Sequence, residues 1–334
     1  MTSPVISVII PVKNAGSVFK ESLSSITSNR EADYEVIVID DHSTDTSGAI
    51  ARHYSCQVIT LQESLGPARA RNIGAQAAKG EILLFIDSDI IVPTDTLRRV
   101  SLIFRDQSIT AIVGVLTDAI RYKNFCSQYK NLWMRYTYIR MPETVSLFYT
   151  SCAAIRRKIF LKSGGFDPGY GKPSVEDTAF GQKLEMMGYK VHLRSDIEVE
   201  HVKYYSFLEI LKTDFYRSAD LLKMTLRNGL RKFLQSNTTS VPSAFMMGVP
   251  LFLSSIPLGL IYFFVPHGRL FSGLLFMLIF CVFLFLNRGF WFWLKSQRGL
   301  LFSLQMVFYL LLDIPIATVG IIYGIIDYTR GRHY

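Results

Sequence analysis

The chain has little cysteine, and the few that it holds show no regular spacing. Its four cysteines, Cys56, Cys126, Cys152 and Cys281, are scattered through 334 residues. A disulfide framework or a zinc site would need paired spacings, so we expect neither. The N-terminus also lacks the charged start and apolar run of a secretory signal, because a strand pattern begins at Val5. We therefore expect the first domain to remain in the cytoplasm.

Charge is nearly absent from residues 241–327, while residues 1–235 carry most of the acids and bases. With 49% hydrophobic residues overall, this split predicts a soluble domain followed by a membrane domain. The net charge is +9, yet the Lys and Arg residues are not gathered in one tract, so nucleic acid is not an expected partner. Many lie between residues 203 and 232, a placement that suits an anionic membrane surface.

Short apolar runs alternate with helical patterns through the first third of the chain. The alternation predicts an α/β domain in which a mostly parallel sheet carries helices on both faces. The expected strands are residues 5–11, 34–39, 58–61 and 81–89, and the expected helices include 17–28 and 67–79.

Acidic residues follow two of these strands. Asp87-Ser88-Asp89 closes the 81–89 run, and Asp40-Asp41 closes the second strand. Strand ends of a parallel sheet meet at one edge, and carboxylate oxygens are what Mg²⁺ and Mn²⁺ prefer. Arg71, one helix earlier, could face the same crevice, which would suit a ligand with a base or sugar at one end and a diphosphate at the other. The alternatives are an exposed turn after a core strand, helix capping with Asp45 as the cap, and a surface arginine.

Further elements follow in the second hundred residues. Helix 121–140 has an aromatic stripe that indicates a core face or contact with lipid headgroups. Helix 175–188 begins with Glu176 and Asp177, which also suit the dipole of a helix start. His201 ends the last strand and is either a packed histidine or a metal ligand. The other expected strands are 111–116, 189–193 and 197–201.

Five motifs in this order resemble glycosyltransferase family 2, the nucleotide-sugar-dependent enzymes with a GT-A fold, over roughly residues 5–205. They are Ser7-Val8-Ile9-Ile10-Pro11, Val38-Ile39-Asp40-Asp41-His42-Ser43-Thr44-Asp45, Arg69-Ala70-Arg71-Asn72-Ile73-Gly74, Asp87-Ser88-Asp89, and Gly164-Gly165-Phe166-Asp167 followed by Glu176-Asp177.

The resemblance implies roles for the matching positions. It implies that Asp89 binds Mg²⁺ or Mn²⁺ across the diphosphate, with His201 completing the metal site as in some relatives. Asp177 matches the family's catalytic base, and Glu176 is its neighbour. The residues it places against the donor are Pro11, Asp40, Asp41, Arg71, Asp87 and Ser88.

The sequence departs from two patterns of the family, and these departures bear on the number of sugars transferred and on the kind of acceptor. No Gln-x-x-Arg-Trp follows the base, Tyr216-Arg217-Ser218 being the nearest basic-aromatic stretch, which argues for transfer of a single sugar. Polyisoprenyl-phosphate glycosyltransferases usually carry Leu-Gln after Asp-x-Asp, whereas Ile90-Ile91-Val92-Pro93 stands here. We therefore favour a hydroxyl acceptor.

The remaining chain predicts membrane attachment. Residues 206–240 include an amphipathic helix, either interfacial or an ordinary surface helix, with basic residues Lys212, Arg217, Lys223, Arg227, Arg231 and Lys232. A transmembrane domain is expected over 241–334, with apolar stretches at about 241–265, 270–287 and 300–326.

The topology of these stretches is not settled by the pattern. A cytoplasmic enzyme domain places the basic loop 287–299 inside, but a third span then places Arg330 and Arg332 outside, against the positive-inside rule. Asp313-Ile314-Pro315 breaks the last stretch, so a re-entrant hairpin is the alternative to three spans. An acid within a membrane is a functional candidate by default.

The function that these observations predict is a metal-dependent, inverting glycosyltransferase of the cell membrane. It would move one sugar from a UDP- or GDP-sugar to a hydroxyl of a membrane lipid or lipid-linked acceptor at the cytoplasmic face. The alternatives are a polyisoprenyl-phosphate glycosyltransferase and a non-catalytic membrane scaffold that binds nucleotide or anionic lipid.

Overall fold

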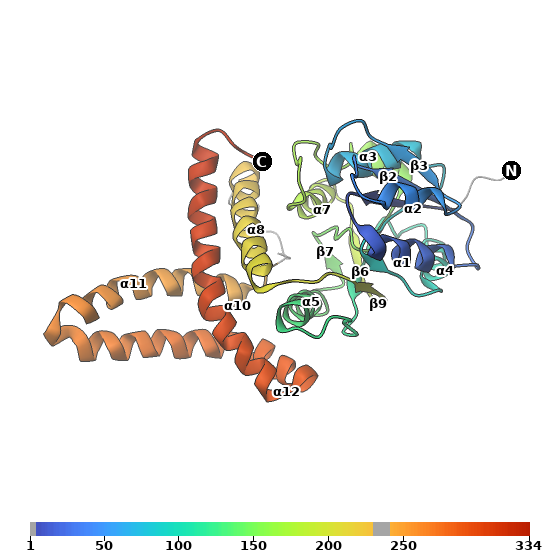
Figure 1. The fold of residues 1–334 in the computed structure, drawn as a ribbon. Helices are drawn as coiled ribbons and strands as arrows, with labels where there is room; N and C mark the ends of the chain where they lie inside the picture. Colours follow the sequence, from blue (N-terminus) through green and yellow to red (C-terminus); the bar gives the residue numbers. More distant parts are fainter. Residues whose placement is uncertain (1–4, 230–240) are drawn as a thin grey trace. The chain divides into compact units, whose positions relative to one another are not determined.

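The computed structural model describes residues 5–229 and 241–334. The chain forms two compact units (Figure 1). The first comprises Met1–Tyr204, Met224–Thr238 and Tyr334, and the second comprises Tyr205–Lys223 and Thr239–His333.

The first half of the sheet in the N-terminal unit is parallel. Strand β1 lies between β2 and β4, and β2 pairs with β3. The apolar runs that form β1 and β4 are buried on both faces, as expected of strands covered by helices on each side. The four strands are β1 (Ile6–Val12), β2 (Tyr34–Asp40), β3 (Gln57–Thr60) and β4 (Ile82–Phe85).

The second half of the sheet is mixed, which differs from the mostly parallel sheet that the sequence predicted. Strand β8 (Ala153–Arg156) is antiparallel to both β4 and β6 (Ala111–Leu116). Strand β9 (Val191–His201) runs parallel to β6 and antiparallel to β5 (Ile90–Ile91) and β7 (Thr144–Val145). The fold is therefore a mixed α/β sheet with the order β3-β2-β1-β4-β8-β6-β9-β5.

Three predicted strands differ from the structure by more than one residue at an end. The expected 81–89 strand ends at Phe85, because the acids that follow turn away from the ladder. The two strands expected at 189–193 and 197–201 form the single strand β9. Its pairing with β6 shifts register between Leu193 and Glu198, so the segment between them interrupts the alternation that a sequence pattern detects.

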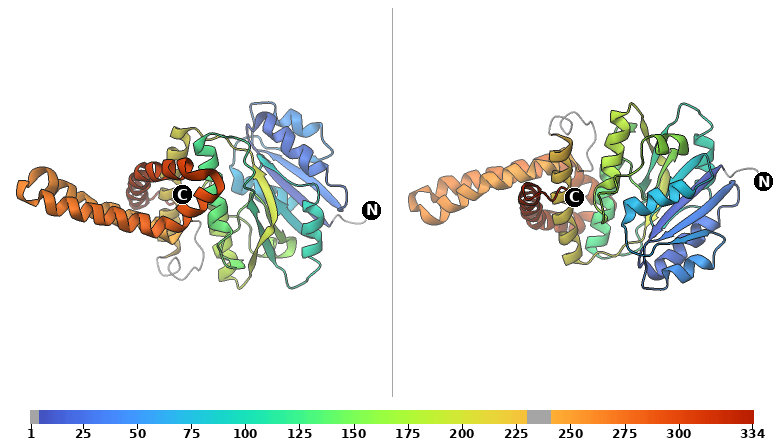
Figure 2. Two further views of the ribbon diagram at one scale, coloured as in Figure 1. Left: turned by 90° about the horizontal axis from the view of Figure 1, so that it is seen from below. Right: turned by 90° about the horizontal axis from the view of Figure 1, so that it is seen from above.

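Helices lie on both faces of the sheet (Figure 2). Helix α3 packs on β1 and β2, and Gly74 allows the close approach because a Cβ there would lie 2.6 Å from Ile9 and Ile39. Tyr129 and Trp133 of α5 are buried, so the aromatic stripe is largely core. The helices are α1 (Gly16–Thr27), α2 (Ser47–Arg52), α3 (Pro67–Ala77), α4 (Thr96–Ile103), α5 (Phe125–Tyr138), α6 (Arg157–Lys162) and α7 (Glu176–Met186).

A cluster of buried phenylalanines supports the edge of the sheet where β4 ends. Their ring centroids lie between 4.7 and 6.1 Å apart. Burial of rings is a large hydrophobic contribution, so the cluster fixes β4, α6 and α7 against one another. Its members are Phe85, Phe148, Phe160, Phe166 and Phe180.

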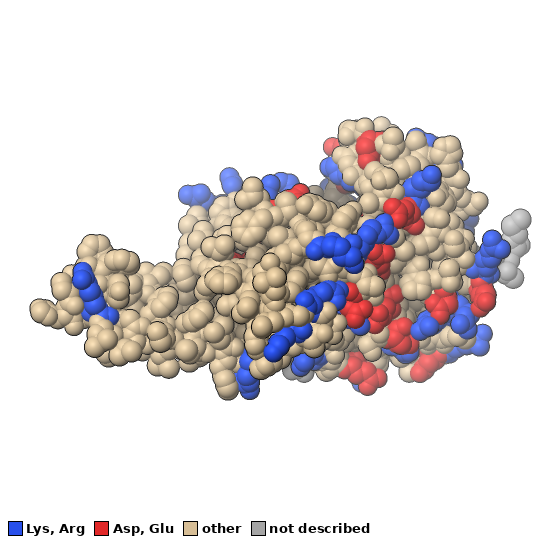
Figure 3. Space-filling model, turned by 60° about the horizontal axis from the view of Figure 1, so that its bottom comes forward, with Lys and Arg blue, Asp and Glu red and all other residues tan. Residues whose placement is uncertain are grey.

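The second unit contains two helical stretches that are long and apolar enough to be candidate membrane spans, Ala244–Phe264 and Pro266–Thr329. Many of their large apolar side chains are exposed, Phe264 and Leu270 by 77% each, as expected for contact with lipid. In Figure 3 the arm at the left, formed by the first stretch and the start of the second, is almost free of charged residues apart from a basic patch near its tip. The elements are α8 (Phe207–Asn228), α10 (Ser243–Met246), α11 (Gly248–Phe264), a 3-10 turn (Pro266–Gly268) and α12 (Arg269–Thr329).

Helix α12 differs from the predicted loops. The expected loop 287–299 is helical, and the chain departs from helical geometry only at Gly299, with φ 85°. The sequence Asp313-Ile314-Pro315 does not break the helix either, since apolar helices accommodate proline when neighbouring groups satisfy the freed carbonyl. The kink divides α12 into two pieces of roughly 30 residues, each long enough for a hydrocarbon core of ~30 Å.

Helix α8 packs against the end of α12 within this unit. Gly320 and Gly324 face the backbone carbonyls of Phe215 and Ala219, and a Cβ would lie 2.4 and 2.7 Å from these oxygens. Small residues four apart are what allow two helices to approach this closely. Part of α8 therefore has a protein partner, and an interfacial position for the rest stays a prediction. Residues 230–240, including Arg231 and Lys232, lie outside the described residues.

Candidate active site

Asp89 and His201 meet because of the register of two short strands. Strand β5 pairs with β9 so that Ile90 lies opposite His201, and Val202 N donates to Asp89 O over 2.8 Å. The Asp89 Oδ2 atom then lies 3.4 Å from His201 Nε2.

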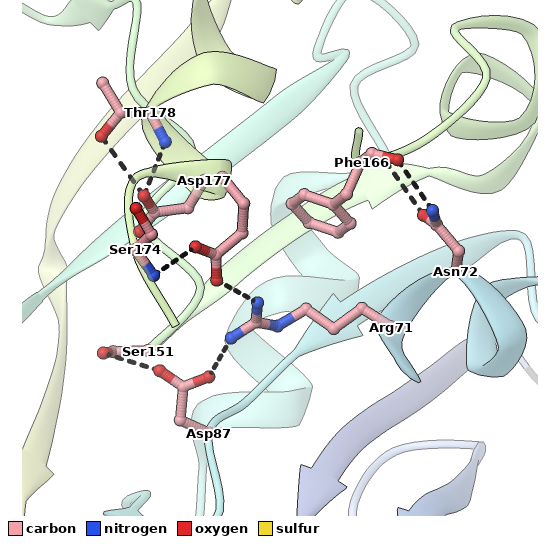
Figure 4. A network of polar contacts seen from close by, with 9 residues as sticks. Arg71, Asn72, Asp87, Ser151, Phe166, Ser174, Asp177 and Thr178 are labelled. Carbon is pink, nitrogen blue, oxygen red and sulfur yellow. Dashed lines mark hydrogen bonds and ion pairs between the residues drawn. The ribbon is translucent and has the colours of Figure 1, made fainter. Parts of the chain in front are cut away.

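Arg71 points from α3 into a cluster of carboxylates (Figure 4). Its Nη2 lies 2.7 Å from Asp87 Oδ1, and its Nη1 lies 2.9 Å from Glu176 Oε1. Burial lowers the pKa of Arg71, but the two negative charges outweigh this effect and raise it above the ordinary value. Asp87 also accepts a hydrogen bond from Ser151 Oγ over 3.2 Å. The guanidinium thus bridges the end of β4 and the start of α7.

The two acids at the start of α7 have different surroundings. Glu176 is buried at 4% exposure and accepts from Ser174 N over 2.9 Å, in addition to its pair with Arg71. Asp177 is half-buried, and its Oδ1 accepts from Thr178 N over 2.6 Å (Figure 4). The arrangement neutralises Glu176 inside the protein and leaves Asp177 as the more accessible carboxylate.

Asn72, the residue after Arg71, anchors the glycine loop before α7. Its Nδ2 donates to Phe166 O over 2.8 Å, and its Oδ1 accepts from Phe166 N over 2.9 Å. Gly165 has φ 66°, and a Cβ there would lie 2.4 Å from Asn72 Oδ1. The second glycine of the motif is therefore required by the approach of Asn72. These two hydrogen bonds fix the glycine loop to α3.

The strand-end residues of the proposed donor side have partners of their own. Asp41 accepts from Ser64 Oγ, Leu65 N and Gly66 N, which fixes the turn before α3. Asp40 accepts from Ser43 N over 2.9 Å and lies against α2.

The helix cap and the end of β1 complete this side of the site. Asp45 accepts from Ser47 N, although the N-cap position of α2 is Thr46. Pro11 lies near the end of β1, opposite Ile39. Ser88 is half-buried between the two acids. Contact of these residues with a donor stays a prediction.

The residues present fit a magnesium or manganese ion held jointly with a diphosphate. Within the described part of the chain no group of three or more His, Cys, Asp and Glu side chains could hold a metal alone. Mg²⁺ is commonly held by one or two carboxylates together with substrate phosphates, so Asp89 and His201 would be a sufficient protein contribution. Their separation of 3.4 Å is close to the ~3 Å between neighbouring ligands of an octahedral ion with bonds of about 2.1 Å.

Sequence reasoning missed several polar residues at this edge. Ser151 precedes β8 and contacts Asp87, Asn131 lies in α5 and contacts His201, and Lys13 donates to Ser64. Asn72 was part of a motif but received no role. Lys13 could have been proposed from the sequence, because it directly follows the strand that ends at Val12. No sequence pattern pointed to Asn131 or Ser151.

This combination of a mixed sheet, strand-end acids and an acidic helix start is the GT-A fold of nucleotide-sugar transferases. A solved structure of the mannosyltransferase PcManGT from Pyrobaculum calidifontis in complex with GDP-Man and Mn²⁺ has a similar fold, with a TM-score of 0.56 and 20% identity. The match covers 97% of this chain and 88% of that one.

Residues 7–164 match the model of glycosyl transferase family 2, and this part of the chain belongs to that family. The glycosyltransferase GlyG of Streptococcus pneumoniae is 31% identical over 117 residues, which are 34% of this chain and 39% of the relative. The poly(ribitol-phosphate) beta-N-acetylglucosaminyltransferase TarS of Staphylococcus aureus is 26% identical over 239 residues, 66% of this chain and 40% of the relative. The chain thus spans less than half the length of these curated relatives.

Proposed function

We propose that the protein is a metal-dependent, inverting glycosyltransferase that moves one sugar from a nucleotide-sugar donor to a hydroxyl of a membrane lipid or lipid-linked acceptor. The observation that carries this proposal is the bridge made by Arg71 between Asp87, at the end of β4, and Glu176, beside Asp177. It brings a donor-side carboxylate and a candidate base to one edge of the sheet.

Asp177 is the proposed base. An acceptor hydroxyl is a weak nucleophile, and a carboxylate within hydrogen-bond reach can take its proton as the oxygen attacks C1 of the sugar. Attack opposite the leaving diphosphate inverts the anomeric centre. Glu176 is committed to Arg71 and Ser174, so its proposed role is to hold the start of α7 and with it the base.

Asp89 and His201 are the proposed ligands of Mg²⁺ or Mn²⁺. Such an ion, when bound, supplies positive charge to the leaving diphosphate. Pro11, Asp40, Asp41, Asp87 and Ser88 would line the nucleoside end. The solved neighbour of the same fold carries GDP-Man and Mn²⁺, which makes a nucleotide-sugar and a divalent ion the first ligands to test.

A membrane acceptor is proposed from the C-terminal unit. Its two candidate spans would anchor the enzyme in the cell membrane with the catalytic unit on the cytoplasmic side. An acceptor at the lipid surface is then within reach. The name of the staphylococcal relative gives poly(ribitol-phosphate), a polyol phosphate, as what that protein glycosylates, which supports a hydroxyl as the attacking group.

The test uses the full chain in lipid nanodiscs. UDP- and GDP-sugars are supplied with Mn²⁺ and extracted membrane lipids, and products are identified by mass spectrometry with the anomeric configuration determined by NMR. We expect one donor to give a singly glycosylated, inverted product and chelation to abolish it. A chain that releases no nucleoside diphosphate from any donor would be a scaffold, and the proposal would be wrong.

The base is tested by Asp177→Asn against Glu185→Gln, an exposed acid on the same helix. Loss of a general base lowers kcat by about 10²–10⁴-fold, whereas Glu185→Gln should leave kcat unchanged. A polyisoprenyl phosphate acceptor is already an anion and needs no base. Near-normal activity of Asp177→Asn would therefore favour that alternative.

A further inference from the structure

Asn131 contacts His201 from a helix to which the family motifs assign no role. It lies in α5, is 1% exposed, and its Oδ1 is 3.1 Å from His201 Nδ1. Burying an amide among apolar side chains is costly unless its polar atoms are bonded. Asn131 meets this requirement, because its Nδ2 also donates to Ser127 O over 2.9 Å.

The bond to Ser127 fixes the orientation of the amide. If the amide were flipped, Oδ1 would face the Ser127 carbonyl oxygen, and two acceptors would oppose each other. Oδ1 must therefore face His201 and can only accept a hydrogen bond. It follows that Nδ1 of His201 carries the proton.

This assignment determines what the other ring nitrogen offers. In a neutral imidazole with the proton on Nδ1, the Nε2 atom has a lone pair. That lone pair faces Asp89 Oδ2 over 3.4 Å, longer than the usual N–H···O distance of about 2.7–3.2 Å. Two acceptors directed at each other favour a shared cation.

We propose that Asn131 is a positioning residue that holds His201 in the Nδ1–H tautomer, so that Nε2 and Asp89 together receive a divalent metal ion. The inference rests on the proposed function, since it names a partner for the same metal site. Outer partners of this kind orient ligating histidines in metal sites generally, and their loss weakens metal affinity about 10–100-fold.

The first test measures Mn²⁺ affinity of the full chain in the presence of UDP or GDP, by electron paramagnetic resonance of free Mn²⁺. Asn131→Leu keeps the volume and removes the acceptor, and we expect affinity to fall about 10–100-fold. Gln128→Leu is the matched control, because Gln128 is another buried amide of α5 that bonds the carbonyl oxygens of Ile120 and Tyr122.

A second readout needs no metal. Long-range proton–nitrogen NMR, at a pH well above the ordinary histidine pKa of about 6.5, reports the tautomer of His201, assigned with a His201→Gln variant. We expect Nδ1–H in the wild type and Nε2–H in Asn131→Leu, where Asp89 becomes the available acceptor.

The outcomes separate the inference from the proposed function. Wild-type affinity in Asn131→Leu, or a loss no larger than in Gln128→Leu, overturns the role of Asn131 while the metal site stands. An Nε2–H tautomer in the wild type overturns it as well. A wild type that binds no Mn²⁺ with either nucleotide refutes the metal site itself.

Discussion

Arg71 donates a hydrogen bond to Glu176 over 2.9 Å, and the side chains of both residues are only 6% exposed. The two residues are 105 positions apart, so this ion pair closes α3 onto the start of α7. Arg71 was expected to contact the base or diphosphate of the donor. Its two terminal nitrogens contact Asp87 and Glu176, which makes it a bridge between the two sides of the site. Contact of Arg71 with a donor stays a prediction.

The first prediction concerns the loss of this bridge. Arg71→Met leaves the buried carboxylate of Glu176 and the part-buried carboxylate of Asp87 without their cation. Breaking a buried ion pair generally destabilises by about 3–5 kcal/mol. Arg71→Lys should recover little of the lost stability, because one ammonium group cannot reproduce the two separate contacts that the guanidinium makes with Asp87 and Glu176. Glu176→Gln should destabilise less than Arg71→Met, since Asp87 remains paired.

Thermal and chemical unfolding of the purified chain in detergent measures these effects. Arg69→Met is the matched control, because Arg69 lies on the same helix but is exposed. Equal stability losses in Arg69→Met and Arg71→Met would show that the bridge has no special importance.

Much of this site could be predicted because its residues stand at strand ends. Asp41, Asp87 and Asp89 stand at or just beyond the ends of apolar runs, and a parallel arrangement brings such ends to one edge. Asn131 could not be predicted, since one polar residue within a helix with an aromatic stripe belongs to no motif and its partner lies 70 positions away.

The fold could also be predicted in part. The first strands and helices followed from period and turn residues, while the antiparallel strands β7 and β8 depend on long-range pairing. In α12, a loop was expected where charges and tryptophans gather. Charges do not end a helix, and the break lies at Gly299, where a positive φ is required.

The second prediction concerns the contact of Asn72 with the glycine loop. Gly164→Ala and Gly165→Ala both place a Cβ on a residue with positive φ, so both should lose about 1–2 kcal/mol through backbone strain. Only Gly165→Ala adds a clash, 2.4 Å from Asn72 Oδ1, whereas the nearest atom at Gly164 is Lys183 Nζ at 3.6 Å.

Unfolding midpoints should therefore place Gly165→Ala well below Gly164→Ala. Adding Asn72→Ala to each variant completes the experiment. The stability losses of Asn72→Ala and Gly165→Ala should be non-additive, and those of Asn72→Ala and Gly164→Ala should be additive. Additive losses in both pairs would contradict the proposed contact.

The third prediction concerns Cys152, which follows Ser151. Burial raises the pKa of Cys152 to about 12, and the negative charge of Asp87 adds to this effect. Because the thiolate is the reactive form, the folded protein should resist alkylation at Cys152 in mildly alkaline buffer. Half-exposed Cys56 should react faster.

Mass-spectrometric mapping after brief iodoacetamide treatment measures both rates, and protein denatured in detergent gives the fully reactive reference. Rapid labelling of Cys152 in the folded chain would mean that the strand end beside Asp87 opens in solution, which would contradict the burial of Cys152.

The last prediction concerns the packing of α8 on α12. At Gly320 an added Cβ would lie 2.4 Å from the Phe215 carbonyl oxygen, and the obstacle is backbone that cannot rotate away. Gly320→Ala should therefore force the helices apart, with the buried Lys223–Asp327 pair, 3.7 Å apart, losing its contact as a consequence. Gly259→Ala in α11 has no atom within 4 Å of the new Cβ and is the control.

Differential scanning fluorimetry in detergent should show a lower unfolding temperature for Gly320→Ala but not for Gly259→Ala, and limited proteolysis should cut α8 sooner in Gly320→Ala. Identical behaviour of the two variants would show that this close helix contact is not formed in the protein.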